Sequence, residues 1–245
     1  MKVFKTYLAI LALLVASSHV DSYAALITVV NSTKSVADET RNVSGFTGIT
    51  SAGSYNVTIT MGNTESLKLE GDADQIADIE TVVENGILKI RNKKSTGSWK
   101  NSWSGKVNIY VNAKSLKSIT LSGSGDINVK GTVKSSDVTT TLSGSGSITL
   151  TVDATNYLAT ISGSGEIKAS GRAENAKINV NGSGGFEGNS LRTNVTSARV
   201  SGSGDISVNA NKSLEAAMSG SGNIRYSGSA DVKSSKSGSG RISKL

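Results

Sequence analysis

Apolar and polar residues alternate in short runs through most of the chain from about residue 40 onward. One run, containing Ile119 and Leu121, precedes a glycine-rich tetrapeptide, and another, containing Ile127 and Val129, follows it. Alternation with a period of two predicts short strands with one buried face. The same arrangement recurs about every 19 residues. We therefore expect a repetitive all-β structure.

The tetrapeptide Ser-Gly-Ser-Gly separates these runs and occurs seven times, once with Asn as its first residue. The copies begin at Ser122, Ser143, Ser162, Asn181, Ser201, Ser219 and Ser237. Successive copies start 18 to 21 residues apart. The glycines that we assign to structural turns are Gly123, Gly125, Gly144, Gly146, Gly163, Gly165, Gly182, Gly184, Gly202, Gly204, Gly220, Gly222, Gly238 and Gly240.

Two short strands, a glycine turn and a polar return fill a coil of about 19 residues, which leaves no room for a crossover helix. The compact solution is a parallel β-solenoid, in which each coil pairs with the coils above and below it. A corner with positive φ costs an ordinary residue roughly 1–2 kcal/mol and a glycine almost nothing. The chain has no proline, in keeping with a ladder in which nearly every backbone N–H donates. Flexible Gly/Ser linkers, the alternative, lack apolar periodicity.

Residues 40–115 differ from the seven repeats in residues 116–245. Their alternating runs are longer, and we expect coils with longer strands that begin the same solenoid and close its N-terminal end. Glu84-Asn85-Gly86 predicts a hairpin turn, and Gly62-Asn63 predicts a tight turn between strands. Asp72 is a candidate N-cap of a short helix that ends near Ile79.

The first 24 residues have the layout of a secretory signal peptide. Lys2 and Lys5 precede an apolar run, Tyr7–Ala16, and small residues flank the expected cleavage site after Ala24. The run is shorter than the roughly 20 residues that a membrane-spanning helix needs, although an uncleaved anchor is an alternative. We expect export, a leader segment over residues 25–39, one solenoid domain over residues 40–245 and no transmembrane segment in the mature chain.

Charge and composition narrow the function classes. The net charge is +7, and it becomes +6 without residues 1–24, but the basic residues are scattered. A mild positive balance favours anionic partners, whereas nucleic-acid binding calls for a basic stripe. The chain has no Cys, and its only histidine is His19. Nucleophilic mechanisms with a His base and the usual zinc sites are therefore excluded from the mature chain. We expect no cofactor, no metal site and no catalytic residue.

Carboxylate chemistry needs a separate test. The residues that directly follow the seven motifs should form one column, which reads Asp126, Ser147, Glu166, Gly185, Asp205, Asn223 and Arg241. Its nearest acids are two coils apart, roughly 9.5 Å. That separation is at the outer limit for inverting glycosidases and too long for retaining ones. Other columns could still combine acids. Because Asp follows only two motifs, a calcium ladder is not favoured.

The two tryptophans mark the best candidate for ligand contact. Trp99 and Trp103 lie in the surface loop that we expect over residues 93–105, and Lys100 stands between them. Aromatic rings beside cations can stack on sugar rings or settle at a membrane interface. The alternative is that these rings cover the open end of the solenoid.

Several segments resemble one bacterial family. They are Val43–Ile49, Val57–Ile59, Val83–Ile90, Leu116–Ile127 and Ser219–Gly228. In this order they resemble the putative auto-transporter adhesin family, head GIN domain. The resemblance implies a right-handed β-helix-like fold in exported envelope proteins, and it brings no established catalytic residues.

We therefore expect an exported, non-catalytic binding or scaffold module of the bacterial cell envelope, located in the periplasm, on the outer surface or outside the cell. Its partner would be an anionic glycan, a cell-surface component or another envelope protein, and its oligomeric state is left open. Two alternatives stand beside this expectation. One is a polysaccharide-active enzyme on a β-helix, and the other is a surface protein that self-associates through its strand edges.

Overall fold

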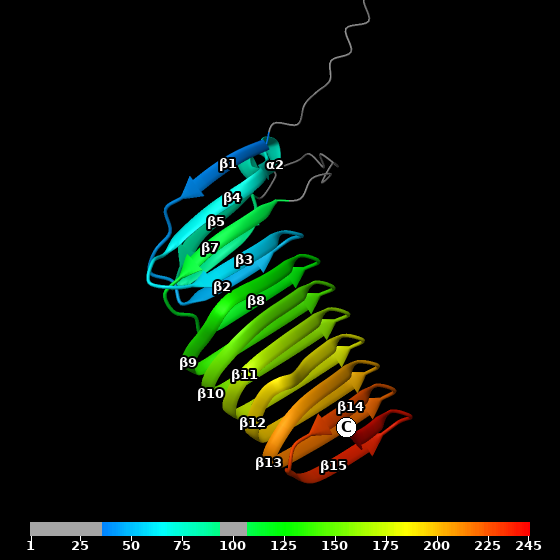
Figure 1. Cartoon of the computed structure of the whole chain (residues 1–245). Helices are drawn as coiled ribbons and strands as arrows, with labels where there is room; N and C mark the ends of the chain where they lie inside the picture. The colour runs from blue at the N-terminus through cyan, green and yellow to red at the C-terminus, as the bar shows by residue number, and fades with distance from the viewer. Residues whose placement is uncertain (1–35, 94–106) are drawn as a thin grey trace, which may run out of the picture. The chain divides into compact units, whose positions relative to one another are not determined.

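The structure, a computed structural model, describes residues 36–93 and 107–245. The expected signal peptide, residues 1–24, lies outside the described residues. The described strands pair into one 16-stranded sheet that winds into a stack of coils (Figure 1). One coil takes about 19 residues, because Ser147 pairs with Glu166. The predicted β-solenoid that turns at the glycine motifs is confirmed.

Five coils of the repeat are each a single continuous strand. They are β9 (Asp126–Gly144), β10 (Ser147–Gly163), β11 (Glu166–Gly182), β12 (Gly185–Gly202) and β13 (Asp205–Gly220). Each pairs in parallel with the next. We expected two short strands per coil. Because the ladder pairing continues through the rest of the coil, each coil instead forms one strand of 16 to 19 residues, which includes a glycine with positive φ at Gly131 in β9 and at Gly171 in β11.

The glycine turns lie directly over one another. Gly163 pairs with Gly144 on one side and with Gly182 on the other. Gly182 has φ of +114°, and a Cβ atom there would lie 2.6 Å from the Gly163 carbonyl oxygen. Gly184 has no such φ, but its Cβ would lie 2.5 Å from the Gly165 oxygen. The first glycine of a motif is thus required by both conformation and space, and the second by space alone.

The core is built from columns of inward-facing side chains, one from each coil. The column just before the glycine turns is buried and aliphatic from β8 (Ser118–Gly123) to β13. Its members are Leu121, Leu142, Ile161, Val180, Val200 and Met218. Each side chain packs on the equivalent side chain of the next coil, so the alternation seen in the sequence is what closes the interior.

The C-terminal coil ends this column with a charge. It consists of β14 (Asn223–Ser227) and β15 (Asp231–Ser237), and β16 (Arg241–Lys244) pairs with β14. Lys236 occupies the position opposite Met218. Its side chain is exposed and Nζ donates a 3.0 Å hydrogen bond to the Gly240 oxygen. A charged side chain in a core column protects an open sheet edge from further pairing.

The coils at the N-terminal end are not stacked in chain order. The strand β2 (Gly48–Ala52) pairs in parallel with both β6 (Ile87–Asn92) and β8. Likewise β3 (Asn56–Met61) pairs with both β7 (Asn108–Ala113) and β9. The coil made by β2 and β3 therefore lies between the β6–β7 coil, which follows it in the chain, and the repeats (Figure 1).

Antiparallel strands close this end. The strand β4 (Ser66–Asp72) pairs with β7, and β1 (Val36–Arg41) pairs with β4. Residues 36–39 of β1 fall in the segment assigned from the sequence to the leader. On the other half of the coil, β5 (Ile79–Glu84) forms a hairpin with β6. Its turn has positive φ at Asn85 and Gly86, as predicted.

A short helix connects β4 to β5. The helix α2 (Ala73–Ala77) buries Ile76, and the Asp72 carboxylate accepts hydrogen bonds from the backbone N–H groups of Asp74 and Gln75. Asp72 is thus the N-cap that the sequence predicts. Arg41 of β1 donates to the carbonyl oxygen of Ile76 at 3.0 Å. The helix and β1 are therefore held together at the end of the stack.

Candidate binding groove

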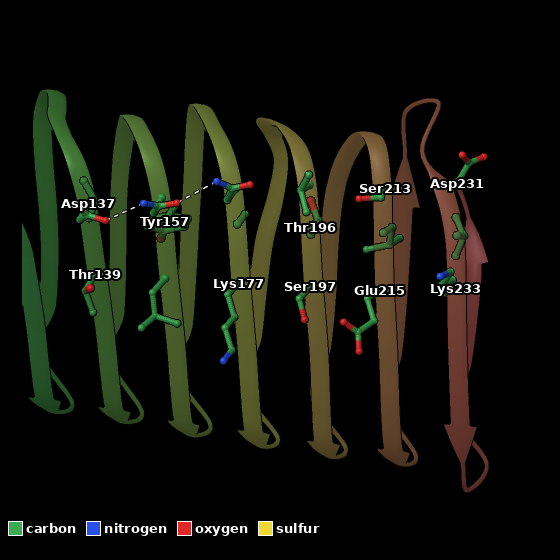
Figure 2. Close-up of a pocket in the computed structure, with 18 residues that line it drawn as sticks. Asp137, Thr139, Tyr157, Lys177, Thr196, Ser197, Ser213, Glu215, Asp231 and Lys233 are labelled. Atoms are coloured by element: carbon green, nitrogen blue, oxygen red, sulfur yellow. Dashed lines mark hydrogen bonds between the residues drawn. The ribbon is translucent and has the colours of Figure 1, made fainter.

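A groove with a volume of about 1130 Å³ crosses six coils on the side of the solenoid shown in Figure 2. Each coil contributes three consecutive residues. The triplets are 137–139, 156–158, 175–177, 195–197, 213–215 and 231–233. They are aligned by the parallel register of β9 to β13 and β15. The groove therefore runs along the solenoid axis, across the strands.

The middle residue of each triplet forms the floor. In five coils its side chain points into the core and is less than 5% exposed, at Val138, Tyr157, Ala176, Thr196 and Leu214. The Tyr157 hydroxyl shares a 2.9 Å hydrogen bond with Thr140 Oγ1, and burial raises its pKa well above the usual value. The floor accessible to a ligand is therefore mainly backbone, and it is held rigidly by the core beneath it.

A ladder of amide and carboxylate groups forms one wall. Asn156 Nδ2 donates to Asp137 Oδ1 at 2.9 Å, and Asn175 Nδ2 donates to Asn156 Oδ1 at 3.0 Å, as the dashed lines in Figure 2 mark. The bonds from Asn156 and Ser136 hold the pKa of Asp137 below its usual value. The next residue in this column, Val195, is apolar and 43% exposed. The ladder ends there.

The opposite wall mixes hydroxyl, charged and apolar side chains. Its members are Thr139, Leu158, Lys177, Ser197, Glu215 and Lys233. Glu215 accepts a 2.8 Å hydrogen bond from Arg199 Nη2, outside the groove. The two walls thus present polar groups of both signs, with Leu158 and Val195 as apolar interruptions. This arrangement suits binding of an extended polar molecule.

The sequence singles out two sets of residues, the tryptophan loop and the column after the glycine motifs. Trp99, Lys100 and Trp103 are outside the described residues, so their role stays a prediction. The expected column after the glycine motifs is present, since Ser147 pairs with both Asp126 and Glu166. Ser147 Oγ donates to Asp126 Oδ1 at 2.6 Å. Acids of this column are two coils apart, as the spacing predicts.

Glu166 and Glu187, which belong to different columns of neighbouring coils, contact the same ammonium group and are closer together than the acids within one column. Lys168 Nζ lies 3.2 Å from Glu166 Oε2 and 3.1 Å from Glu187 Oε2. The hydrogen bond from Lys168 is the main reason why the pKa of Glu187 is lowered. The column that follows the glycine motifs does not contain this pair, because Glu187 is opposite Lys168 and not opposite Glu166.

The alignment of the triplets, though not the concavity of the groove, could have been found from the sequence by one signal. Every triplet begins six residues before the first residue of a glycine motif, as with Asp137 before Ser143 and Asp231 before Ser237. Among the described residues, no cluster of three or more His, Cys, Asp or Glu side chains could hold a metal ion. In the same part of the chain, no helix has the length and apolar character needed to cross a membrane.

A parallel β-solenoid with an open lateral groove defines the structural class of this chain. Residues 45–230 match the family described as "putative auto-transporter adhesin, head GIN domain". The chain belongs to this family, as its motifs indicate. A search among curated proteins finds no significant match.

Solved structures share the fold along most of the chain. A "putative adhesin" from Bacteroides fragilis is 26% identical, with a TM-score of 0.77, and the alignment covers 86% of this chain and 98% of that one. A "putative lipid binding protein" from Parabacteroides distasonis is also 26% identical, with a TM-score of 0.71 and coverage of 86% and 96%. A "putative adhesin" from Parabacteroides merdae, at 18% identity, has a TM-score of 0.67 with coverage of 86% and 96%.

Proposed function

We propose that the chain is an exported, adhesin-like binding module of the bacterial cell envelope, that it has no catalytic role, and that the groove is its binding surface. The observation that carries the proposal is the alignment of wall residues from six coils in one continuous groove. The strands beneath are paired along their length, so the ligand meets a surface that is already ordered, which reduces the entropy lost on binding. The family description supports adhesion.

Export is supported by the N-terminal pattern of Lys2, Lys5 and the apolar run Tyr7–Ala16. The direct test is to produce the full chain with a C-terminal tag in a bacterial host and to sequence the N-terminus of the product from the envelope and the medium. We expect it to begin at Ala25. A product that stays in the cytoplasm and still begins at Met1 would overturn this part of the proposal.

Catalysis by the pair Glu166 and Glu187 is disfavoured by the ammonium group that contacts both carboxylates. A glycosidase needs one carboxylic acid that keeps its proton, which requires a raised pKa. Glu187 instead has a lowered pKa because Lys168 donates a hydrogen bond to it, and the same ammonium contacts Glu166. The arrangement is that of a surface ion-pair network. Release of reducing ends from a polysaccharide would favour the enzyme alternative.

Self-association by end-to-end stacking is disfavoured by Lys236. A second copy that extended the sheet at β15 would cover this ammonium group, which is exposed in the single chain. Burial of an unpaired charge is costly. The open edge is therefore a poor template for another coil, which favours a binding module over a polymer-forming surface protein.

Binding through the groove can be tested with one substitution and a matched control. Val195→Arg places a long charged side chain in the middle of the groove, at a position that is already 43% exposed. Thr149→Arg adds the same charge at an exposed position outside the groove. We expect the exported wild-type protein and the Thr149→Arg variant to bind intact bacterial cells saturably, and Val195→Arg to bind much less. Equal binding by all three would refute the groove as the binding surface.

A further inference from the structure

The groove does not concentrate the positive charge of the chain. The acids on its walls are Asp137, Glu215 and Asp231, and the bases are Lys177 and Lys233. The groove thus carries one net negative charge, while the whole chain carries +7. Asp137 lies in the first coil of the groove and Asp231 in the last. Lys233 lies in the same coil as Asp231, and Glu215 is paired with Arg199 at 2.8 Å just outside the groove, so the groove is close to neutral. A polyanion along the groove would therefore find no excess of positive charge to bind it.

The walls also lack a continuous strip of apolar side chains that an acyl chain could follow. Twelve outward-facing side chains form them, and only Leu158 and Val195 are wholly apolar. The apolar floor side chains point into the core and are buried. An acyl chain is stabilised by a continuous apolar surface, which these walls do not provide. A ligand with many hydroxyl groups instead finds a donor or an acceptor on nearly every coil.

The spacing of these groups favours a regular linear polymer. Six coils at about 4.8 Å extend the groove over roughly 24 Å. Amide groups repeat at this step at Asn156 and Asn175, and hydroxyl groups recur at Thr139, Ser197 and Ser213. A polypeptide in the groove could not pair with the sheet, because the groove crosses the strands and the backbone groups beneath it are used in the ladder.

We infer that the groove binds an uncharged linear glycan, whose chain lies along the solenoid axis over the wall residues of β9 to β13 and β15. This inference rests on the proposed binding function and specifies its ligand. Sugar hydroxyl groups would exchange hydrogen bonds with Asn175, Ser197 and Ser213, and the aliphatic side chains of Leu158 and Val195 would contact the C–H faces of the sugar rings.

The test is a glycan array that carries uncharged and anionic glycans side by side, probed with the exported full-length product. We expect the bound glycans to be uncharged and linear, and their affinity to be the same at low and high salt, because screening acts only on charged partners. Val195→Arg should weaken binding at least about tenfold, which corresponds to about 1.4 kcal/mol. Thr149→Arg should bind like wild type.

The other outcomes separate the ligand class from the binding function. Binding of sulfated or carboxylated glycans, or of phosphatidylglycerol vesicles, that falls with salt and is lost in Val195→Arg would overturn the uncharged glycan and leave the groove as the binding surface. If no glycan or vesicle binds, or if Val195→Arg binds like wild type, both the inference and the proposed use of the groove are overturned.

Discussion

Gly184, the last residue of the fourth motif, and Gly185, which directly follows it, allow the stacking argument to be tested by the same substitution at neighbouring positions. At Gly184 a Cβ atom would lie 2.5 Å from the Gly165 carbonyl oxygen and 2.7 Å from a methyl carbon of Ile161. At Gly185 the nearest atom would be Glu166 Cγ, at 3.9 Å, an ordinary contact distance. Neither position has a φ that favours glycine, so only space distinguishes them.

The expected effects have opposite signs. In Gly184→Ala, the new methyl group would meet the Gly165 carbonyl oxygen, which belongs to the paired backbone and can move only if the two coils separate. We therefore expect the free energy of unfolding to fall by about 1–3 kcal/mol, the usual cost of overpacking a core. In Gly185→Ala, alanine loses less conformational entropy on folding than glycine does, so the free energy of unfolding should rise by about 0.5–1 kcal/mol. The two variants should therefore differ by about 1.5–4 kcal/mol. Gly182 has φ of +114°, so the backbone conformation alone should lower the free energy of unfolding of Gly182→Ala by about 1–2 kcal/mol.

Urea unfolding followed by far-UV circular dichroism measures these differences. Because coils contact mainly their neighbours, a solenoid can unfold in more than one step. Hydrogen exchange of β11 and β12 should therefore accompany the titration, and Gly184→Ala should weaken protection there first. Equal unfolding midpoints for Gly184→Ala and Gly185→Ala, with equal protection of these coils, would show that close approach of the turns does not limit the residue at this position.

Three further predictions concern buried or displaced polar groups. Ser51 is fully buried and its hydroxyl has no hydrogen-bond partner among the described residues, so Ser51→Ala should raise the free energy of unfolding by about 1 kcal/mol; a lower melting temperature would contradict this. Burial raises the pKa of Tyr55 to about 12 and that of Tyr157 further. Their contribution to stability is complete below the unfolded pKa of about 10 and is lost progressively above it, because the tyrosines of the unfolded chain ionise before those of the folded protein. The melting temperature should fall above about pH 10, and less steeply in Tyr157→Phe; an equal slope would refute the assignment. Lys236→Met continues the column of Met218 and should increase the mass measured by sedimentation as concentration rises; unchanged sedimentation would show that Lys236 does not protect the edge.

The sequence pattern predicts the alignment of the groove residues but not the shape of the groove. The triplets keep a constant distance of six residues from the glycine motifs, so their alignment follows from the repeat. The concave shape of the groove does not follow from the repeat. It depends on how each coil bends before its triplet, and insertions on that side of the triplet shift the register, as between Lys168 and Gly171. No residue type marks this bend consistently.

The sequence by itself determined the repeat, the parallel stacking at the glycine turns, the column after each motif, the Asn85-Gly86 hairpin and the cap at Asp72. These features follow from local conformation and from a period that brings equivalent residues into register. Only the tertiary structure decided the order of the N-terminal coils, the diagonal contact of Glu166 with Glu187 through Lys168, and the groove. The physical reason is that every coil presents the same alternation of apolar and polar residues to its neighbours. Such a pattern shows that a coil is stacked, but it does not distinguish which coil lies beside it.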